Sequence, residues 1–146
     1  MRGFAIGFAV ILACWALPAS AQKTEMSLFD GACATESNIA GTPFGCELMV
    51  STNIDQGYDG VVLVFMHKTE GGGGMIAIGG VRDPDGTLRA QTVQYRPGEP
   101  VAATGDCAFT RKGRKIKSVR CTVVTGSGAD ERRSTIEFTP TREHRM

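Results

Sequence analysis

The clearest alternation of apolar and polar residues lies between Asp106 and Gly126, in the segment DCAFTRKGRKIKSVRCTVVTG. Arg114 is equidistant from Cys107 and Cys121, so a chain that folds back there places the two cysteines opposite each other. Side chains alternate between the two faces of a strand. An apolar face, a polar face and a turn that contains Gly113 together predict a half-buried β-hairpin.

This register also assigns the neighbouring side chains to a face of the hairpin. It pairs Phe109 with Val119, and Arg111 with Lys117. The apolar face is expected to contact a core, and the polar face to contact solvent. The predicted apolar face carries Cys107, Phe109, Val119, Cys121 and Val123. The predicted polar face carries Thr110, Ser118, Arg120 and Thr122.

The rest of the chain also reads as short strands joined by turns. Strands are predicted at 26–29, 46–52, 61–66, 75–81, 87–95 and 134–139, and residues 101–103 lead into the hairpin. The run VVLVFM at 61–66 does not alternate, which predicts a strand buried on both faces. No stretch has a sustained helical period. About seven or eight strands predict an all-β fold, an antiparallel β-sandwich in the first place and a small barrel in the second.

The first twenty-one residues have the pattern of a secretory signal peptide. Arg2 precedes an apolar run that ends at Leu17, and Ala19-Ser20-Ala21 supplies small residues at both positions that a signal peptidase reads. This run is shorter than a membrane-spanning helix, which needs about twenty residues. We expect cleavage before Gln22 and a periplasmic or secreted protein with no transmembrane span. The alternative is a lipoprotein signal in which Cys14 is the lipidated residue.

Residues 22–146 are long enough for one domain and too short for two. They contain four cysteines, and an even number in an exported chain indicates disulfides more often than metal binding or catalysis. Three pairings are formally possible. The hairpin register favours Cys107–Cys121, which leaves Cys33–Cys46. Neither pair has the close spacing of redox or zinc sites, so we expect no metal and no cofactor.

Charge is distributed unevenly along this domain. Residues 22–106 carry five Lys or Arg and eleven Asp or Glu, whereas residues 107–146 carry ten and four. The hairpin contributes much of the positive charge, and cations held together at its tip can attract an anionic partner. The candidate anion-binding residues are Arg111, Lys112, Arg114, Lys115, Lys117 and Arg120.

The expected partner of these cations is an anionic envelope component, either lipopolysaccharide or anionic lipid, or else a protein. Nucleic acid is disfavoured, because the hairpin has a single aromatic residue, Phe109, and the register turns it inward. A solvated tip whose cations block edge-to-edge aggregation explains the same pattern without a partner.

Signals for catalysis are sparse. Gly126-Ser127-Gly128 lacks the flanking residues of a nucleophile elbow, and the four glycines at 71–74 lead into a predicted strand instead of a helix. We identify no catalytic residue and favour a non-enzymatic binding or structural protein of the cell envelope. The alternatives are a small secreted hydrolase that uses His67 and a periplasmic inhibitor of a host enzyme. The oligomeric state is not predicted.

Overall fold

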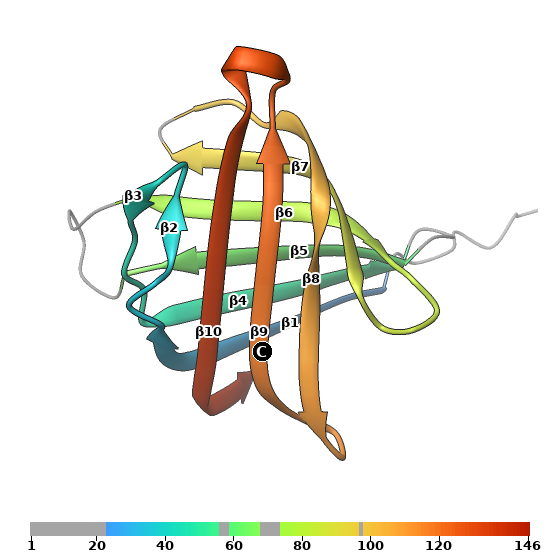
Figure 1. Ribbon diagram of the computed structural model, residues 1–146. Coiled ribbons are helices and arrows are strands. Elements are labelled where there is room, and N and C mark those ends of the chain that lie inside the picture. The colour runs from blue at the N-terminus through green and yellow to red at the C-terminus, as the bar shows by residue number, and fades with distance from the viewer. Residues whose placement is uncertain (1–22, 56–58, 68–73, 97) are drawn as a thin grey trace, which may run out of the picture.

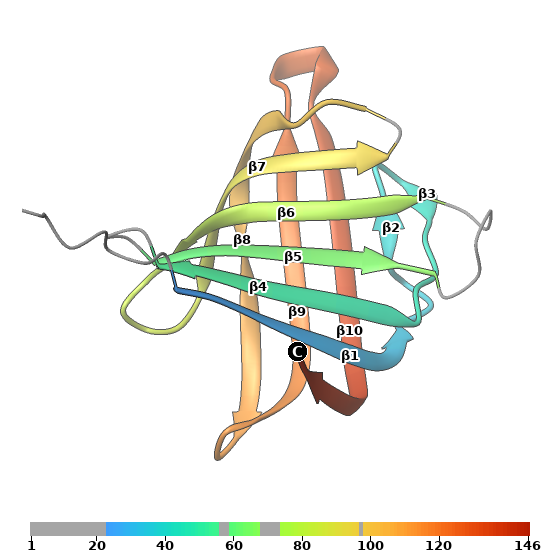
Figure 2. The ribbon, with the colours of Figure 1, turned by 180° about the vertical axis from the view of Figure 1, so that it is seen from behind.

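The computed structural model describes residues 23–55, 59–67, 74–96 and 98–146, and its strands form a closed antiparallel β-barrel (Figure 1). Eight strands follow the order β1-β4-β5-β6-β7-β8-β9-β10, and pairing of β10 with β1 completes the ring, as Figure 2 shows from behind. These strands are β1 (Lys23–Cys33), β4 (Leu48–Asp55), β5 (Asp59–Met66), β6 (Met75–Arg82), β7 (Leu88–Arg96), β8 (Val101–Lys112), β9 (Lys115–Thr125) and β10 (Arg132–Arg145). The all-β class is confirmed. The structure is the barrel, the second of the two architectures that the strand pattern predicts.

The predicted strands are all present, but the first and last are longer than expected. β1 and β10 pair from Ser27↔Arg145 to Cys33↔Phe138, so the polar ends of both strands are held by main-chain hydrogen bonds to each other. The segment between β1 and β4, in which no strand was predicted, contains two short strands, β2 (Asn38–Ile39) and β3 (Thr42–Pro43). One turn of 3-10 helix, Gly128–Asp130, joins β9 to β10. The predicted signal peptide and the glycines at 71–73 lie outside the described residues.

The apolar run at 61–66 has one buried face, not the two that were predicted. Val61, Leu63 and Phe65 point into the barrel and are almost fully buried, whereas Val62 and Val64 lie half-buried on the outer wall. A closed barrel is a single layer, so every strand has an inner and an outer face. The run fails to alternate because Val62 and Val64, on the outer face of the barrel wall, are also apolar.

Inward-facing side chains from the eight strands fill the barrel. β-branched, aliphatic and aromatic residues dominate, as expected of an eight-stranded barrel whose interior is packed and not hollow. The largest fully buried side chains are Phe65, Phe138, Met49, Leu63, Ile76, Ile78, Leu88, Ile136, Val93, Val119, Val123 and Cys107.

Both predicted disulfides are present. Cys107 pairs directly with Cys121 across β8 and β9 inside the barrel, and Cys33 bonds to Cys46. Such bonds fit an oxidising compartment. Among the described residues, no helix has the length and apolar character needed to span a membrane.

The register of the basic hairpin is confirmed in its inner half and wrong at its tip. Phe109 lies opposite Val119 as predicted, but Arg111 lies opposite Ile116 and not opposite Lys117. A β-bulge between Thr110 and Arg111 causes the shift, because an extra residue on one strand displaces the pairing beyond it. The turn follows at Gly113, whose φ of 63° lies in the left-handed region that favours glycine.

The segment that carries β2 and β3 covers one end of the barrel (Figures 1 and 2). Phe44 from this segment is buried in the core, and β2 pairs with β10 at Thr135↔Asn38. The hydroxyl of Ser134, itself buried, accepts a hydrogen bond from the Ala40 amide at 3.0 Å. The covered end is therefore tied to the wall by hydrogen bonds and by the nearby Cys33–Cys46 bridge.

Candidate functional site

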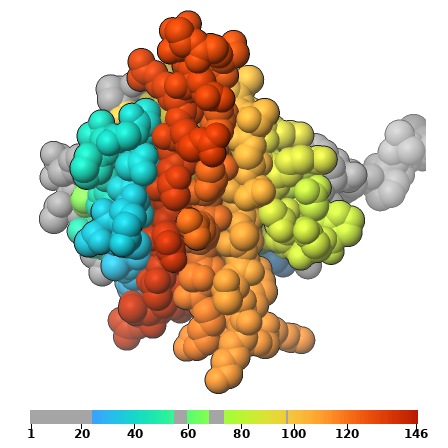
Figure 3. All heavy atoms as spheres, viewed as in Figure 1, coloured from blue at the N-terminus to red at the C-terminus, as the bar shows by residue number. Residues whose placement is uncertain are grey.

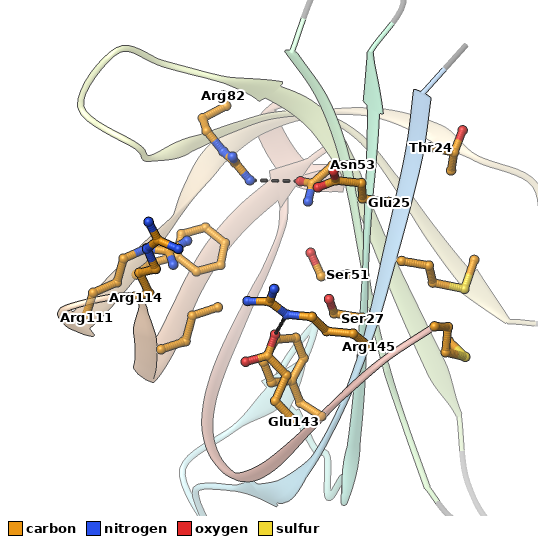
Figure 4. A pocket seen from close by; sticks show the side chains of 15 residues that line it. Thr24, Glu25, Ser27, Ser51, Asn53, Arg82, Arg111, Arg114, Glu143 and Arg145 are labelled. Atoms are coloured by element: carbon orange, nitrogen blue, oxygen red, sulfur yellow. Dashed lines mark hydrogen bonds and ion pairs between the residues drawn. The ribbon is translucent and has the colours of Figure 1, made fainter. Parts of the chain in front are cut away.

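A cavity of about 470 Å³ lies at the opposite, open end of the barrel. Its lining comes from the beginning of β1, the ends of β4, β6 and β10, and the hairpin formed by β8 and β9 (Figure 4). Pockets that bind small molecules typically span about 300–1,000 Å³, and the mouth of a β-barrel is one of their usual places. This cavity is therefore the candidate functional site.

Strand register turns a row of polar side chains into the cavity. Buried Phe29 marks the inner face of β1, and alternation along the strand places Ser27 and Glu25 on the same face. On β4, Ser51 lies opposite Ser27, and Asn53 lies opposite Glu25. We call these four side chains, Glu25, Ser27, Ser51 and Asn53, the polar wall. It presents hydroxyl, amide and carboxylate groups together.

The end of β10 brings one arginine to this wall. Arg145 pairs with Ser27 and Glu143 pairs with Phe29, so both side chains lie on the inner face of the β1–β10 ladder. The Arg145 Nε lies 3.5 Å from the Glu143 Oε1, an ion pair drawn in Figure 4. This contact places a cation beside Glu143 at the cavity, although the Arg145 side chain is 79% exposed.

A second arginine reaches the cavity from the end of β6. Arg82 pairs with Leu88, which is fully buried, so the two side chains share the inner face. The Arg82 Nη2 donates a hydrogen bond of 2.8 Å to the Asn53 Oδ1 (Figure 4). The bond links the guanidinium to the polar wall and orients the Asn53 amide.

The basic hairpin supplies two more arginines, from the side of the cavity that faces the polar wall. Arg111 follows Phe109 on the same face of β8, and its guanidinium carbon lies 5.5 Å from the centroid of the Phe109 ring. Arg114 lines the cavity from the turn. Within the described chain, no ion pair joins Arg111 or Arg114 to an acidic side chain. Both guanidinium groups therefore remain available to a ligand.

The structure thus splits the predicted cation cluster into two groups. Arg111 and Arg114 line the cavity, and we call them the inner pair. All six side chains are exposed, but the other four do not line the cavity, and Figure 3 shows that the tip of the hairpin projects beyond the rest of the molecule. These outer cations are Lys112, Lys115, Lys117 and Arg120.

Arg82 and Arg145 were not identified as site residues from the sequence. They are distant from the hairpin in sequence, and only the closed ring brings them to the same cavity. The one local signal is the position of Arg82, which directly follows the strand predicted at 75–81 and precedes the turn at 83–86. That signal does not distinguish a ligand-binding arginine from a solvated one.

The cavity lining carries more positive than negative charge. Four arginines line it, against the two carboxylates of Glu25 and Glu143. Arginine stays protonated in proteins at any physiological pH. A concave site with an excess of one sign of charge concentrates ions of the opposite sign, so this end of the barrel favours an anion.

The alternative centre at His67 lies at the covered end, away from this cavity. The His67 Nδ1 is 3.5 Å from the Glu47 Oε2, and its ring meets Phe44 edge-on with 6.0 Å between centroids. No described serine, threonine or cysteine is hydrogen-bonded to His67. Among the residues that the structure describes, no group of three or more His, Cys, Asp or Glu side chains is arranged to hold a metal ion.

No family model, curated protein or solved structure matches the chain. The chemistry of the open end is therefore the guide to function. It consists of arginines on the hairpin side, a polar wall on the β1–β4 side, and an opening to solvent between them (Figure 4). Such an arrangement can hold an anion through the guanidinium groups while hydroxyl and amide groups bind the remainder of the ligand.

Proposed function

We propose that this protein is an exported, non-enzymatic binding protein that holds an anionic component of the cell envelope at the open end of its barrel. The observation that carries the proposal is the gathering of four arginines, Arg82, Arg111, Arg114 and Arg145, around one cavity. Two of them, the inner pair, have no acidic partner among the described residues. A site of this kind gains free energy when an oxyanion replaces water at the guanidinium groups.

Export is part of the same proposal. Residues 1–21 have the layout of a signal peptide, and the two disulfides of the remaining chain fit an oxidising compartment. The mature domain would then be residues 22–146, in the periplasm or outside the cell. Lipopolysaccharide and anionic lipids are anionic envelope components within its reach.

The outer cations have a separate role in this proposal. They are exposed on the projecting tip, where their charges act over about 8 Å at physiological ionic strength. Charges of this kind raise the rate of encounter with an anionic surface more than they hold a ligand in place. Binding should therefore combine a salt-sensitive encounter with a more specific contact at the inner pair.

The two groups of cations can be separated by variants of equal charge. Arg111→Ser with Arg114→Ser removes the inner pair, and Lys112→Ser with Lys115→Ser removes two outer cations from the same tip. Binding of each protein to lipopolysaccharide and to anionic vesicles is measured across a salt series. We expect the first variant to lose at least about tenfold in affinity at moderate salt, since hydrogen bonds to charged groups contribute about 1.5–3 kcal/mol.

The variant that lacks Lys112 and Lys115 should lose affinity mainly at low salt. Both variants should keep the melting temperature within a few degrees, because exposed substitutions typically change stability by under about 0.5 kcal/mol. Equal losses for the two variants would show that only total charge matters. If the unmodified protein binds no anionic envelope component at low salt, the tip is a solubility device and the proposal is wrong.

A further inference from the structure

We infer that the cavity at the open end binds a small acidic saccharide, a sugar of one or two rings that carries a phosphate or a carboxylate. The inference rests on the proposed anion-binding function and names the chemical class of the ligand. It comes from the two unlike sides of the cavity, from the filled interior beneath it and from the depth of the polar wall.

The two sides of the cavity match the two parts of such a ligand. On the hairpin side, Arg111 and Arg114 present guanidinium groups, whose fork of N–H donors suits the oxygens of a phosphate or carboxylate. On the facing side, Ser27 and Ser51 present hydroxyl groups that both donate and accept. Figure 4 shows these side chains across the cavity from one another. Sugar hydroxyls need partners of both kinds.

The filled interior argues against a lipid tail as the buried part of the ligand. Phe29, which lines the cavity, is 3% exposed, and two core residues next to lining positions are fully buried: Met49 opposite Phe29 and Leu63 opposite Ser51. No acyl chain can enter the barrel without displacing this packed core. The part of the ligand that enters must therefore be compact, and the polar wall requires it to be hydrophilic.

The depth of the polar side chains argues against a flat anionic surface as the full ligand. Ser51 is 9% exposed and Asn53 is half-buried, with its amide oxygen bonded to the Arg82 guanidinium. A membrane surface resting on the tip would reach the outer cations but not these groups. A soluble sugar, or a sugar unit that projects from a larger glycan, can enter far enough to contact them.

One arginine of the inner pair is partly ordered before any ligand binds. The Arg111 guanidinium lies over the Phe109 ring within cation–π distance, and Phe109 is paired with Val119 in the hairpin ladder. A side chain that is already oriented loses less conformational entropy on binding. The β-bulge at the tip contributes, because it lets Ile116 line the cavity directly opposite Arg111.

Isothermal titration of the mature protein tests the inference with defined probes. These are glucose 1-phosphate and glucuronate as acidic sugars, glucose as the neutral sugar, and inorganic phosphate as the anion alone. We expect at least one acidic sugar to bind about tenfold or more tightly than either glucose or phosphate, because only it engages both sides of the cavity. Anionic vesicles, measured in parallel, report on the proposed function independently of any sugar.

Variants of the polar wall locate the sugar. Ser27→Ala with Ser51→Ala should weaken binding of the acidic sugar about tenfold and leave binding of inorganic phosphate unchanged. Thr52→Ala, on the outer face of the same strand, is the matched control and should change neither. Amide chemical shifts of the unmodified protein give the same information should the double variant not fold, since the sugar should perturb β1 and β4 while phosphate perturbs mainly the hairpin.

Each result bears on the inference. Equal affinity for phosphate and for both acidic sugars would overturn it and leave anion binding intact. Vesicle binding without measurable binding of either acidic sugar would also overturn it while supporting the proposed function. Failure of every anionic probe, vesicles included, would refute both.

Discussion

Removal of the buried disulfide is the sharpest test of how the barrel is stabilised. Cys107→Ala with Cys121→Ala opens a bridge of sequence separation 14 between two fully buried positions. For a loop of about 15 residues the chain-entropy model gives about 3 kcal/mol. Loss of two packed sulfur atoms adds a cavity term, so we expect the free energy of unfolding to fall by about 3–5 kcal/mol. Guanidinium unfolding, analysed by linear extrapolation, measures the change.

The second bridge supplies a control of almost the same loop length. Cys33→Ala with Cys46→Ala opens a loop of sequence separation 13, so the loop-closure contribution is nearly equal. Cys33 is only half-buried, however, and the bridge anchors a covering segment instead of the barrel wall. We expect this variant to lose about 1 kcal/mol less than the other. A loss below about 1 kcal/mol for the buried bridge, or a larger loss for the Cys33–Cys46 bridge, would refute the reasoning.

Three further predictions concern other parts of the chain. Gly105 has a φ of 110°, and a side chain there would meet a backbone carbonyl of β9. Gly105→Ala should therefore lower the free energy of unfolding by more than about 1 kcal/mol, and by more than Gly86→Ala, where φ is 89° but the space is open. Ser134→Ala should lower the free energy of unfolding by about 1–2 kcal/mol and speed amide exchange in the segment that carries β2 and β3. A double-mutant cycle with Tyr95→Phe should show coupling across the 3.1 Å hydrogen bond between the two hydroxyl groups. Strictly additive effects would show that this bond contributes nothing to stability. Intact mass of the protein recovered from the envelope should place its first residue at Gln22, and a lipid-modified product would show that the lipoprotein alternative is correct.

Local patterns predicted most of the strands, because each depends on residues close together in the chain. The pairing of Cys107 with Cys121 follows from their equal distance to the turn, and the second disulfide then follows by elimination. Closure of the barrel has no such signal. It depends on the pairing of Ser27 with Arg145 and its neighbours, which lie at opposite ends of the chain and carry little apolar alternation. A sandwich and a barrel require the same strands, so the choice between them lies in that one ladder.

The bulge at the hairpin tip can be recognised in the sequence. Val119 and Cys121 face inward, so strict alternation would turn Lys117 inward and Ile116 outward. The one apolar residue of the tip is thus out of phase with the strand that contains it. An extra residue at the bulge restores the phase, because it turns Ile116 toward the cavity, opposite Arg111. An apolar residue that breaks the alternation of its strand, among cations, therefore indicates a bulge. A prediction that assumes continuous pairing misses it.

The candidate site shows what a charge cluster in sequence can and cannot predict. Six cations in the hairpin predicted a basic tip. The pleat of the strands and the path of the turn decide which side each one faces, and only Arg111 and Arg114 line the cavity. Closure of the ring then adds Arg82 and Arg145 from β6 and β10, which no local pattern connects to the hairpin. The density of charge along the chain therefore locates the region where an anion is attracted. The register and the closure of the barrel determine where the anion can be held, which is why two variants of equal charge on one tip should bind differently.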